Sequence, residues 1–181
     1  MSVLTSRSSF MEEVEPRRMF AAVTVQGTDA NDNISVTISG PAVVVTLNGV
    51  PTSYTAVRSI SISGGNGNDT INVDGVITVG CAISGNAGND TIYGGSGNDS
   101  ITGNNGSDVI MGYDGDDVIS GNDGADQLDG GAGNDSVYAT DAGTNTDGDQ
   151  DTLFQFYSDA GTDNVLSYSV TEDVLRHSIV S

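Results

Sequence analysis

The sequence predicts an all-β fold built from short strands that recur every nine residues. Between residues 85 and 138 the chain divides into six nonapeptides, GNAGNDTIY, GGSGNDSIT, GNNGSDVIM, GYDGDDVIS, GNDGADQLD and GGAGNDSVY. Glycine stands at the first and fourth positions of every copy, aspartate at the sixth and an aliphatic residue at the eighth, which gives 24 matches in 24 places. Self-similarity at a fixed short period is the signature of a repeat architecture.

Each nonapeptide divides into a turn and a strand. Positions one to six carry turn chemistry, with Gly or Asn where a positive φ is needed. Positions seven to nine form a short strand in which alternation directs only the eighth side chain to one face. If two nonapeptides make one turn of a coil, residues 18 apart stack and alternate repeats face each other. The apolar stacks are then Ile92, Ile110 and Leu128 on one sheet, and Ile101, Ile119 and Val137 on the other.

The aspartates at the sixth position stack in the same way. One series holds Asp90, Asp108 and Asp126, and the other holds Asp99, Asp117 and Asp135. Carboxylates stacked at the spacing of neighbouring strands, about 4.8 Å, repel one another. The arrangement therefore favours a cation between successive turns, and Ca²⁺ takes its ligands from carboxylates and backbone carbonyls.

The nonapeptide resembles the RTX, or hemolysin-type, calcium-binding repeat. This resemblance implies a right-handed parallel β-roll with each ion between turns, held by two aspartates and turn carbonyls. Residues 64–72, GGNGNDTIN, add one more full copy upstream. We interpret the extra turn acids Asp114, Asp116 and Asp123 as solvated, and Tyr113 departs from the repeat at position two. The candidate calcium ligands are Asp69, Asp90, Asp99, Asp108, Asp117, Asp126 and Asp135.

The segments around the repeats suggest four parts. We expect a flexible N-terminal segment at residues 1–20, a β-rich cap at 21–63, the roll at 64–138, and degenerate repeats with an irregular C-terminal cap at 139–181. Residues 27–35 are a degenerate copy with Asp32 at position six, and Asn48-Gly49 suits a hairpin turn. Cys81 replaces the aspartate of its rung, which predicts a turn without that ligand. Two degenerate copies near the C-terminus keep Asp151 with Leu153 and Asp163 with Val165. We assign to the C-terminal cap the side chains of Leu153, Phe154, Phe156 and Tyr157.

Composition excludes several classes of function. The 181 residues contain 5 Lys or Arg against 25 Asp or Glu, for a net charge of −20. Such a chain is no natural partner of nucleic acid, whose recognition needs clustered basic residues. No run of 18 apolar residues is present, so a transmembrane helix is not expected. One cysteine rules out an intrachain disulfide.

Catalysis is also not expected. RTX repeats often follow proteases or lipases in one chain, but the single histidine, His177, supports neither an HExxH zinc site nor a Ser-His-Asp triad. Residues 14–20, VEPRRMF, resemble the LEPR-x-LL motif of bacterial exported proteins. No secretory signal peptide is visible in the first twenty residues. The family resemblance places the protein outside the cell or at its surface.

The leading hypothesis is a non-enzymatic, exported calcium-binding repeat protein that folds when Ca²⁺ binds between stacked turns. One alternative is a surface adhesion module that binds a protein or a polysaccharide. Another is an accessory module of a secreted enzyme. The outward-facing ninth positions show no uniform stripe, so the sequence leaves any ligand beyond calcium open.

Overall fold

The computed structural model describes residues 20–138, together with the backbone of strands 152–156, 164–166 and 174–178. All the regular structure in these residues is β-strand, and none of it is helical. Consequently, the described residues contain no helix long and apolar enough to cross a membrane.

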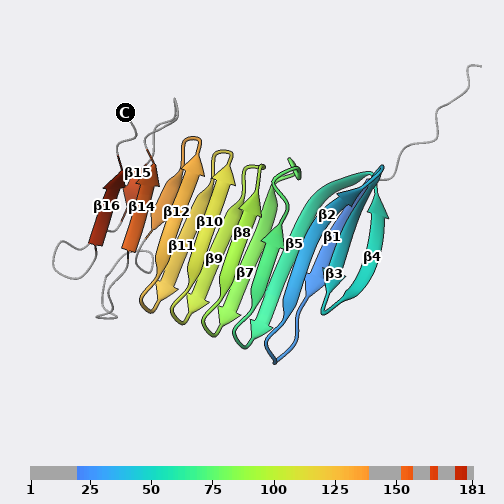
Figure 1. Cartoon of the computed structure of the whole chain (residues 1–181), viewed down its shortest axis with the longest axis horizontal. Coiled ribbons are helices and arrows are strands. Elements are labelled where there is room, and N and C mark those ends of the chain that lie inside the picture. Colours follow the sequence, from blue (N-terminus) through green and yellow to red (C-terminus); the bar gives the residue numbers. More distant parts are fainter. Residues whose placement is uncertain (1–19, 139–151, 157–163, 167–173, 179–181) are drawn as a thin grey trace, which may run out of the picture.

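Two largely parallel sheets lie face to face, because consecutive strands of the repeat region alternate between them (Figure 1). The seven strands of the first sheet, called sheet A, are β1 (Ala21–Gln26), β5 (Val57–Asn66), β7 (Cys81–Ala87), β9 (Ser100–Asn105), β11 (Val118–Asp123), β13 (Ser136–Tyr138) and β15 (Asn164–Leu166). The nine strands of sheet B are, in spatial order, β16 (Val174–Ser178), β14 (Thr152–Phe156), β12 (Gln127–Ala132), β10 (Val109–Asp114), β8 (Thr91–Gly95), β6 (Thr70–Val73), β2 (Asn33–Ser39), β3 (Ala42–Leu47) and β4 (Val50–Thr55). Residues 60–138 thus form about four turns of a parallel β-solenoid, which confirms the predicted parallel β-roll.

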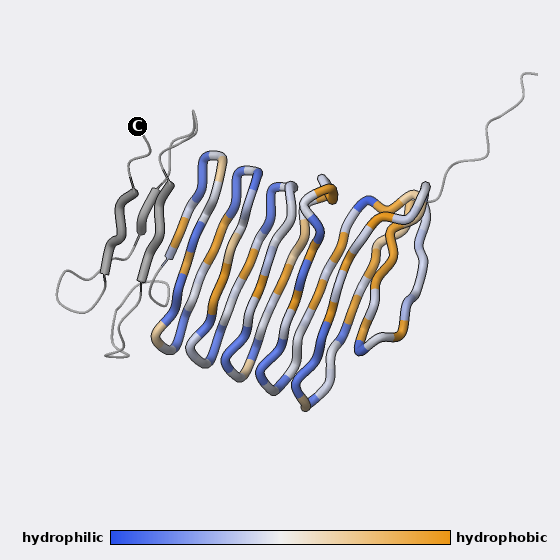
Figure 2. The backbone as a smooth tube through the Cα atoms, viewed as in Figure 1, coloured by the Kyte–Doolittle hydropathy of each residue, from blue (hydrophilic) through white to orange (hydrophobic). Residues whose placement is uncertain are grey.

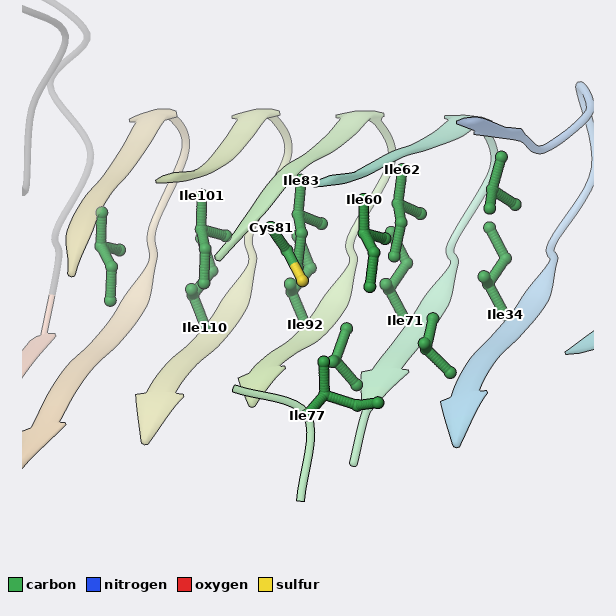
Figure 3. Packing of buried hydrophobic residues seen from close by; sticks show 14 of the residues in the cluster. Ile34, Ile60, Ile62, Ile71, Ile77, Cys81, Ile83, Ile92, Ile101 and Ile110 are labelled. Carbon is green, nitrogen blue, oxygen red and sulfur yellow. The ribbon is translucent and has the colours of Figure 1, made fainter. Parts of the chain in front are cut away.

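The register of the strands confirms two nonapeptides per turn. In sheet B, Ile110 lies opposite both Ile92 and Leu128. In sheet A, Ile119 lies opposite both Ile101 and Val137. All six side chains are buried, and the isoleucines of the two sheets point toward one another (Figure 3). The core is therefore one aliphatic layer per sheet, while the turns are hydrophilic (Figure 2).

The strands upstream of the full repeats continue both sheets. β1 pairs in parallel with β5, and β2 pairs in parallel with β6, so the degenerate copy at residues 27–35 places Ile34 opposite Ile71. Strands β3 and β4 then extend sheet B in antiparallel fashion. Asn48 and Gly49 close their hairpin with φ of 50° and 81°, the positive values that a two-residue turn requires.

One insertion interrupts the period of the roll. Asp69 and Asp90 are 21 residues apart, whereas the later aspartates follow at 18. The extra chain lies in residues 74–80, between β6 and β7, where the Ile77 side chain enters the core. The carbonyl of Ile77 accepts a hydrogen bond from the Ser96 N–H at 2.9 Å, which ties the insertion to the next turn.

The C-terminal strands continue both sheets in parallel. β14 pairs with β12, β15 with β13 and β16 with β14. Leu153 is in register with Leu128, and Val165 with Val137. Asp151, Asp163 and Tyr157 lie outside the described residues, as do residues 14–19 of the VEPRRMF segment.

The aliphatic stack carries much of the stability of the roll, so truncating one of its members is expected to be costly. Ile110 is fully buried, and we expect Ile110→Ala to lower the free energy of unfolding by about 2–5 kcal/mol. The matched control is Val118→Ala, whose outward side chain is 47 % exposed and whose loss is expected to change stability by no more than about 0.5 kcal/mol. Urea unfolding at saturating calcium measures both, and equal losses would contradict the assigned core.

Candidate metal centre

The sixth-position aspartates form two stacks inside the turns. The long ladder consists of Asp32, Asp69, Asp90, Asp108 and Asp126, and the short ladder of Asp99, Asp117 and Asp135. Each of the seven aspartates predicted as ligands is only 1–3 % exposed. The structure therefore brings all seven together as two lines of buried carboxylates.

Apart from Asp32, each ladder aspartate uses one carboxylate oxygen to join neighbouring turns. The backbone N–H of Asp90 donates to Oδ1 of Asp108 at 2.7 Å, and the N–H of Asp108 donates to Oδ1 of Asp126 at 2.8 Å. The short ladder repeats the contact, since the N–H of Asp99 donates to Oδ1 of Asp117 at 2.8 Å. These bonds fix the spacing and orientation of the carboxylates.

The second oxygen is buried without a hydrogen-bond donor. This holds for Oδ2 of Asp69, Asp90, Asp99, Asp108 and Asp117. A buried acceptor without a donor costs about 1–3 kcal/mol, and more when it is charged. Five such atoms at one repeated position indicate a missing positive partner rather than a local accident.

The glycine at position one shows what surrounds this oxygen. A Cβ placed on Gly103 would collide with Oδ2 of Asp108 and would lie 2.8 Å from the carbonyl oxygen of Gly121. A Cβ on Gly85 would likewise meet Oδ2 of Asp90 and the carbonyl oxygen of Gly103. Glycine is required there because a carboxylate oxygen and a carbonyl oxygen of the next turn converge on the same place. Two converging acceptors fit a hard cation such as Ca²⁺.

Burial changes the protonation of the carboxylates. Desolvation raises the pKa of Asp90 and Asp99 to about 6, although N–H donation to each opposes the shift. Desolvation likewise raises the pKa of Asp108 and Asp117 to about 7. Without a cation, these four carboxylates therefore take up protons at a higher pH than an ordinary aspartate does.

The sequence of these repeats matches a known family. The family model for the RTX calcium-binding nonapeptide repeat (4 copies) matches residues 61–75, 82–110 and 102–137. Residues 61–137 are RTX calcium-binding repeats. RTX repeats bind Ca²⁺ as a structural ligand, and an RTX repeat module is what the comparison detects in this chain. No curated protein and no solved structure matches the chain.

At the N-terminal end of the long ladder, the carboxylate of Asp32 receives its hydrogen bonds from other groups of the protein. Oδ2 of Asp32 accepts the backbone N–H of Thr28 at 2.5 Å and its hydroxyl at 3.0 Å. Oδ1 accepts the side-chain amide of Asn48, which belongs to the β3–β4 turn. These bonds lower the pKa of Asp32, with the Thr28 N–H making the largest contribution. Asp32 thus remains ionised at neutral pH without a cation.

The short ladder begins against apolar groups. Cys81 stands at position six of its rung, and its N–H donates to Oδ1 of Asp99 at 2.7 Å. In sheet A, Cys81 pairs with Ile60 of the preceding strand, and Ile60 pairs in turn with Val23. Both of these apolar residues are buried. The thiol of Cys81 donates to the carbonyl of Val79, and burial raises its pKa to about 12. A buried thiol with a raised pKa is a poor nucleophile at neutral pH.

A further ladder at position five was not predicted from the sequence. The side-chain oxygen of Asn89 accepts the N–H of Ser107 at 3.0 Å, and that of Asp116 accepts the N–H of Asn134 at 2.9 Å. The recurrence of Asn, Ser and Asp at position five was the available signal. These oxygens join the turns on the solvent side of the aspartate ladders. Asp114 and Asp123 are exposed, consistent with our interpretation of them as solvated.

The raised pKa values predict that acid stabilises the metal-free RTX roll. A carboxylate whose folded pKa lies above its unfolded value of about 3.9 favours folding when protonated. That contribution is complete below about pH 4 and is lost as the pH rises through 6 to 7. Metal-stripped protein should therefore have a higher melting temperature and a stronger far-UV β signal at pH 5 than at pH 8.

The same measurement in saturating calcium is the control. Protons compete with the cation for carboxylates, so the direction should reverse. A metal-stripped protein that is less structured at pH 5 than at pH 8 would contradict the ladder electrostatics.

Asn48 is predicted to stabilise the end of the long ladder. Asn48→Gly keeps the positive φ but removes the amide that donates to Asp32 and the oxygen that accepts the Asn33 N–H. The expected loss is about 1–3 kcal/mol of unfolding free energy in urea. Asn104→Gly is the matched control, because Asn104 also has a positive φ but its amide donates to the neutral hydroxyl of Ser84. A smaller loss for Asn48→Gly than for this control would refute the stated role.

Proposed function

We propose that this protein is a non-enzymatic, exported calcium-binding module whose roll folds when Ca²⁺ occupies the spaces between successive turns. The observation that carries the proposal is the row of buried Oδ2 atoms without donors, at Asp69, Asp90, Asp99, Asp108 and Asp117. Each lies beside a backbone carbonyl oxygen of the next turn. Calcium supplies the positive charge that these oxygens lack.

The proposed ligands are the sixth-position carboxylates together with backbone carbonyls. Within the described part of the chain, no three His, Cys, Asp or Glu side chains gather closely enough to hold a metal by themselves. Ca²⁺ takes 6–8 oxygens, so turn carbonyls and water must complete each site. The carboxylates proposed are those of Asp69, Asp90, Asp99, Asp108, Asp117, Asp126 and Asp135.

The charge of the chain supports coupling between binding and folding. Without metal, a net charge of −20 and one aliphatic residue per nonapeptide leave little to offset chain entropy. Because only the folded roll brings the ladder oxygens together, calcium binding contributes directly to folding. Extracellular calcium modules bind at about 10⁻⁴–10⁻³ M. Such a chain would stay unfolded inside a cell and fold outside it, as the export proposal requires.

A calcium titration of the full chain tests this proposal. The far-UV β signal is expected to rise between about 0.1 and 1 mM calcium, with no response to the same concentration of magnesium. Mg²⁺ demands tighter octahedral geometry and gives up its water reluctantly, so it should not replace Ca²⁺ between the turns. A complete β signal in metal-stripped protein at pH 8, unchanged by calcium, would refute the proposal.

Replacing one ladder carboxylate should have opposite effects with and without calcium. Asp108→Asn removes the charge but keeps an oxygen for the Asp90 N–H, so metal-stripped protein should be at least as folded as the unsubstituted chain. In calcium the same variant should bind fewer ions by calorimetry, or require about tenfold more calcium for half-folding. Asp123→Asn removes the same charge from an exposed turn and should change neither result. Equal behaviour of the two variants would refute the ligand assignment.

A further inference from the structure

A cavity of about 410 Å³ lies on the outer face of sheet B, and none of the seven proposed calcium ligands lines it. It is within the range of small-molecule sites, roughly 300–1,000 Å³. Its walls combine one aromatic ring with hydroxyl, amide and carboxylate groups. The lining side chains that matter here are those of Ser35, Asn72, Asp74, Ser96, Tyr113 and Asp114.

The aromatic wall is a residue whose backbone conformation is unfavourable for its type. Position two of every full repeat has a positive φ, and all the others are Gly or Asn, the residues that accept it. Tyr113 adopts φ of 79° at this position. A bulky residue there is a genuine outlier, and strain of this kind concentrates at binding sites. Nothing in the core explains it, because the Tyr113 side chain is 46 % exposed.

A second tyrosine holds the ring of Tyr113 in place. Tyr93, on the outer face of the neighbouring strand β8, stacks on it with ring centroids 5.9 Å apart and an interplanar angle of 29°. One face of the Tyr113 ring is therefore covered by protein. A stacked pair of this kind forms a rigid aromatic platform.

The insertion that breaks the period of the roll also contributes to the cavity wall. Asp74 and Gly75 of this segment line the cavity, and the Ser96 hydroxyl donates to the carbonyl of Gly75. Insertions into solenoid repeats gather on one face, which is often the binding face. The strained tyrosine and the only insertion between full repeats at residues 64–138 thus meet at one cavity.

From this combination we propose that the cavity binds an uncharged saccharide. A sugar ring offers a C–H face that packs on an aromatic ring, and edge hydroxyls that donate to carboxylate and amide oxygens. Asp74, Asp114 and Asn72 provide such oxygens beside Tyr113. No Lys or Arg lines the cavity and the chain carries −20, so acidic sugars are disfavoured. No proposed calcium ligand lines this cavity, so the proposal rests on the proposed function only through the calcium-dependent folding of the roll.

The test is calorimetry on the full chain at saturating calcium, with cellotetraose, maltotetraose, mannotetraose and chitotetraose as probes and tetragalacturonate as the acidic comparison. At least one neutral tetrasaccharide should bind, and tetragalacturonate should bind at least tenfold more weakly. Tyr113→Asn should weaken the neutral probe at least tenfold without lowering the melting temperature appreciably, because Asn suits the positive φ. Tyr113→Phe should stay within about threefold of the unsubstituted chain.

The matched control is Tyr138→Asn, the same substitution at an outward position of β13 in sheet A, away from the cavity, and it should leave binding unchanged. Lack of binding to all four neutral probes, equal binding of tetragalacturonate, or full retention by Tyr113→Asn would each overturn the proposal. A circular dichroism spectrum of every sample in calcium separates this outcome from a failure of calcium-dependent folding.

Discussion

The constraint on which the roll depends is the burial of one carboxylate in every nine residues, with one of its two oxygens facing other acceptors. Oδ1 is satisfied by an N–H of the preceding turn, so the carboxylate is held in place whether or not a cation is present. Oδ2 meets a carbonyl oxygen of the next turn beside a glycine that has no room for a side chain. A divalent cation resolves this conflict, and proton uptake resolves it only in part.

The thin core makes this constraint decisive. Each nonapeptide contributes one fully buried aliphatic side chain, as at Ile92 and Ile101. Cohesion between turns therefore relies on the strand ladders, on the aspartate ladders and on the position-five oxygens. The first of these is common to any parallel sheet, whereas the other two exist only because the same residue types recur 18 apart. The roll behaves as a stack in which each turn depends on its neighbours.

The two aspartate ladders differ at their N-terminal ends. At the start of the long ladder, Thr28 and Asn48 supply the donors that Asp32 needs. The short ladder starts from Cys81, behind which Ile60 and Val23 fill the same level with apolar groups. The turns nearest the N-terminal hairpin are therefore satisfied by the protein, and the demand for cations begins after them.

The sequence by itself determined the repeat and, given two nonapeptides per turn, which aliphatic residues and which aspartates stack, because a strict period of nine leaves little freedom. The parallel roll followed from the resemblance to the RTX repeat. The sequence also indicated that the repeat containing Cys81 lacks the carboxylate ligand. Only the tertiary structure decided which oxygen of each carboxylate has a donor, since that depends on contacts between residues 18 apart in different turns. The tertiary structure also decided that Asn48, in a hairpin turn, donates to Asp32. It likewise brought the insertion at residue 74, which follows β6, and Tyr113 of β10 to one cavity. Local sequence specifies each nonapeptide, and the register between successive turns creates the calcium sites and the cavity.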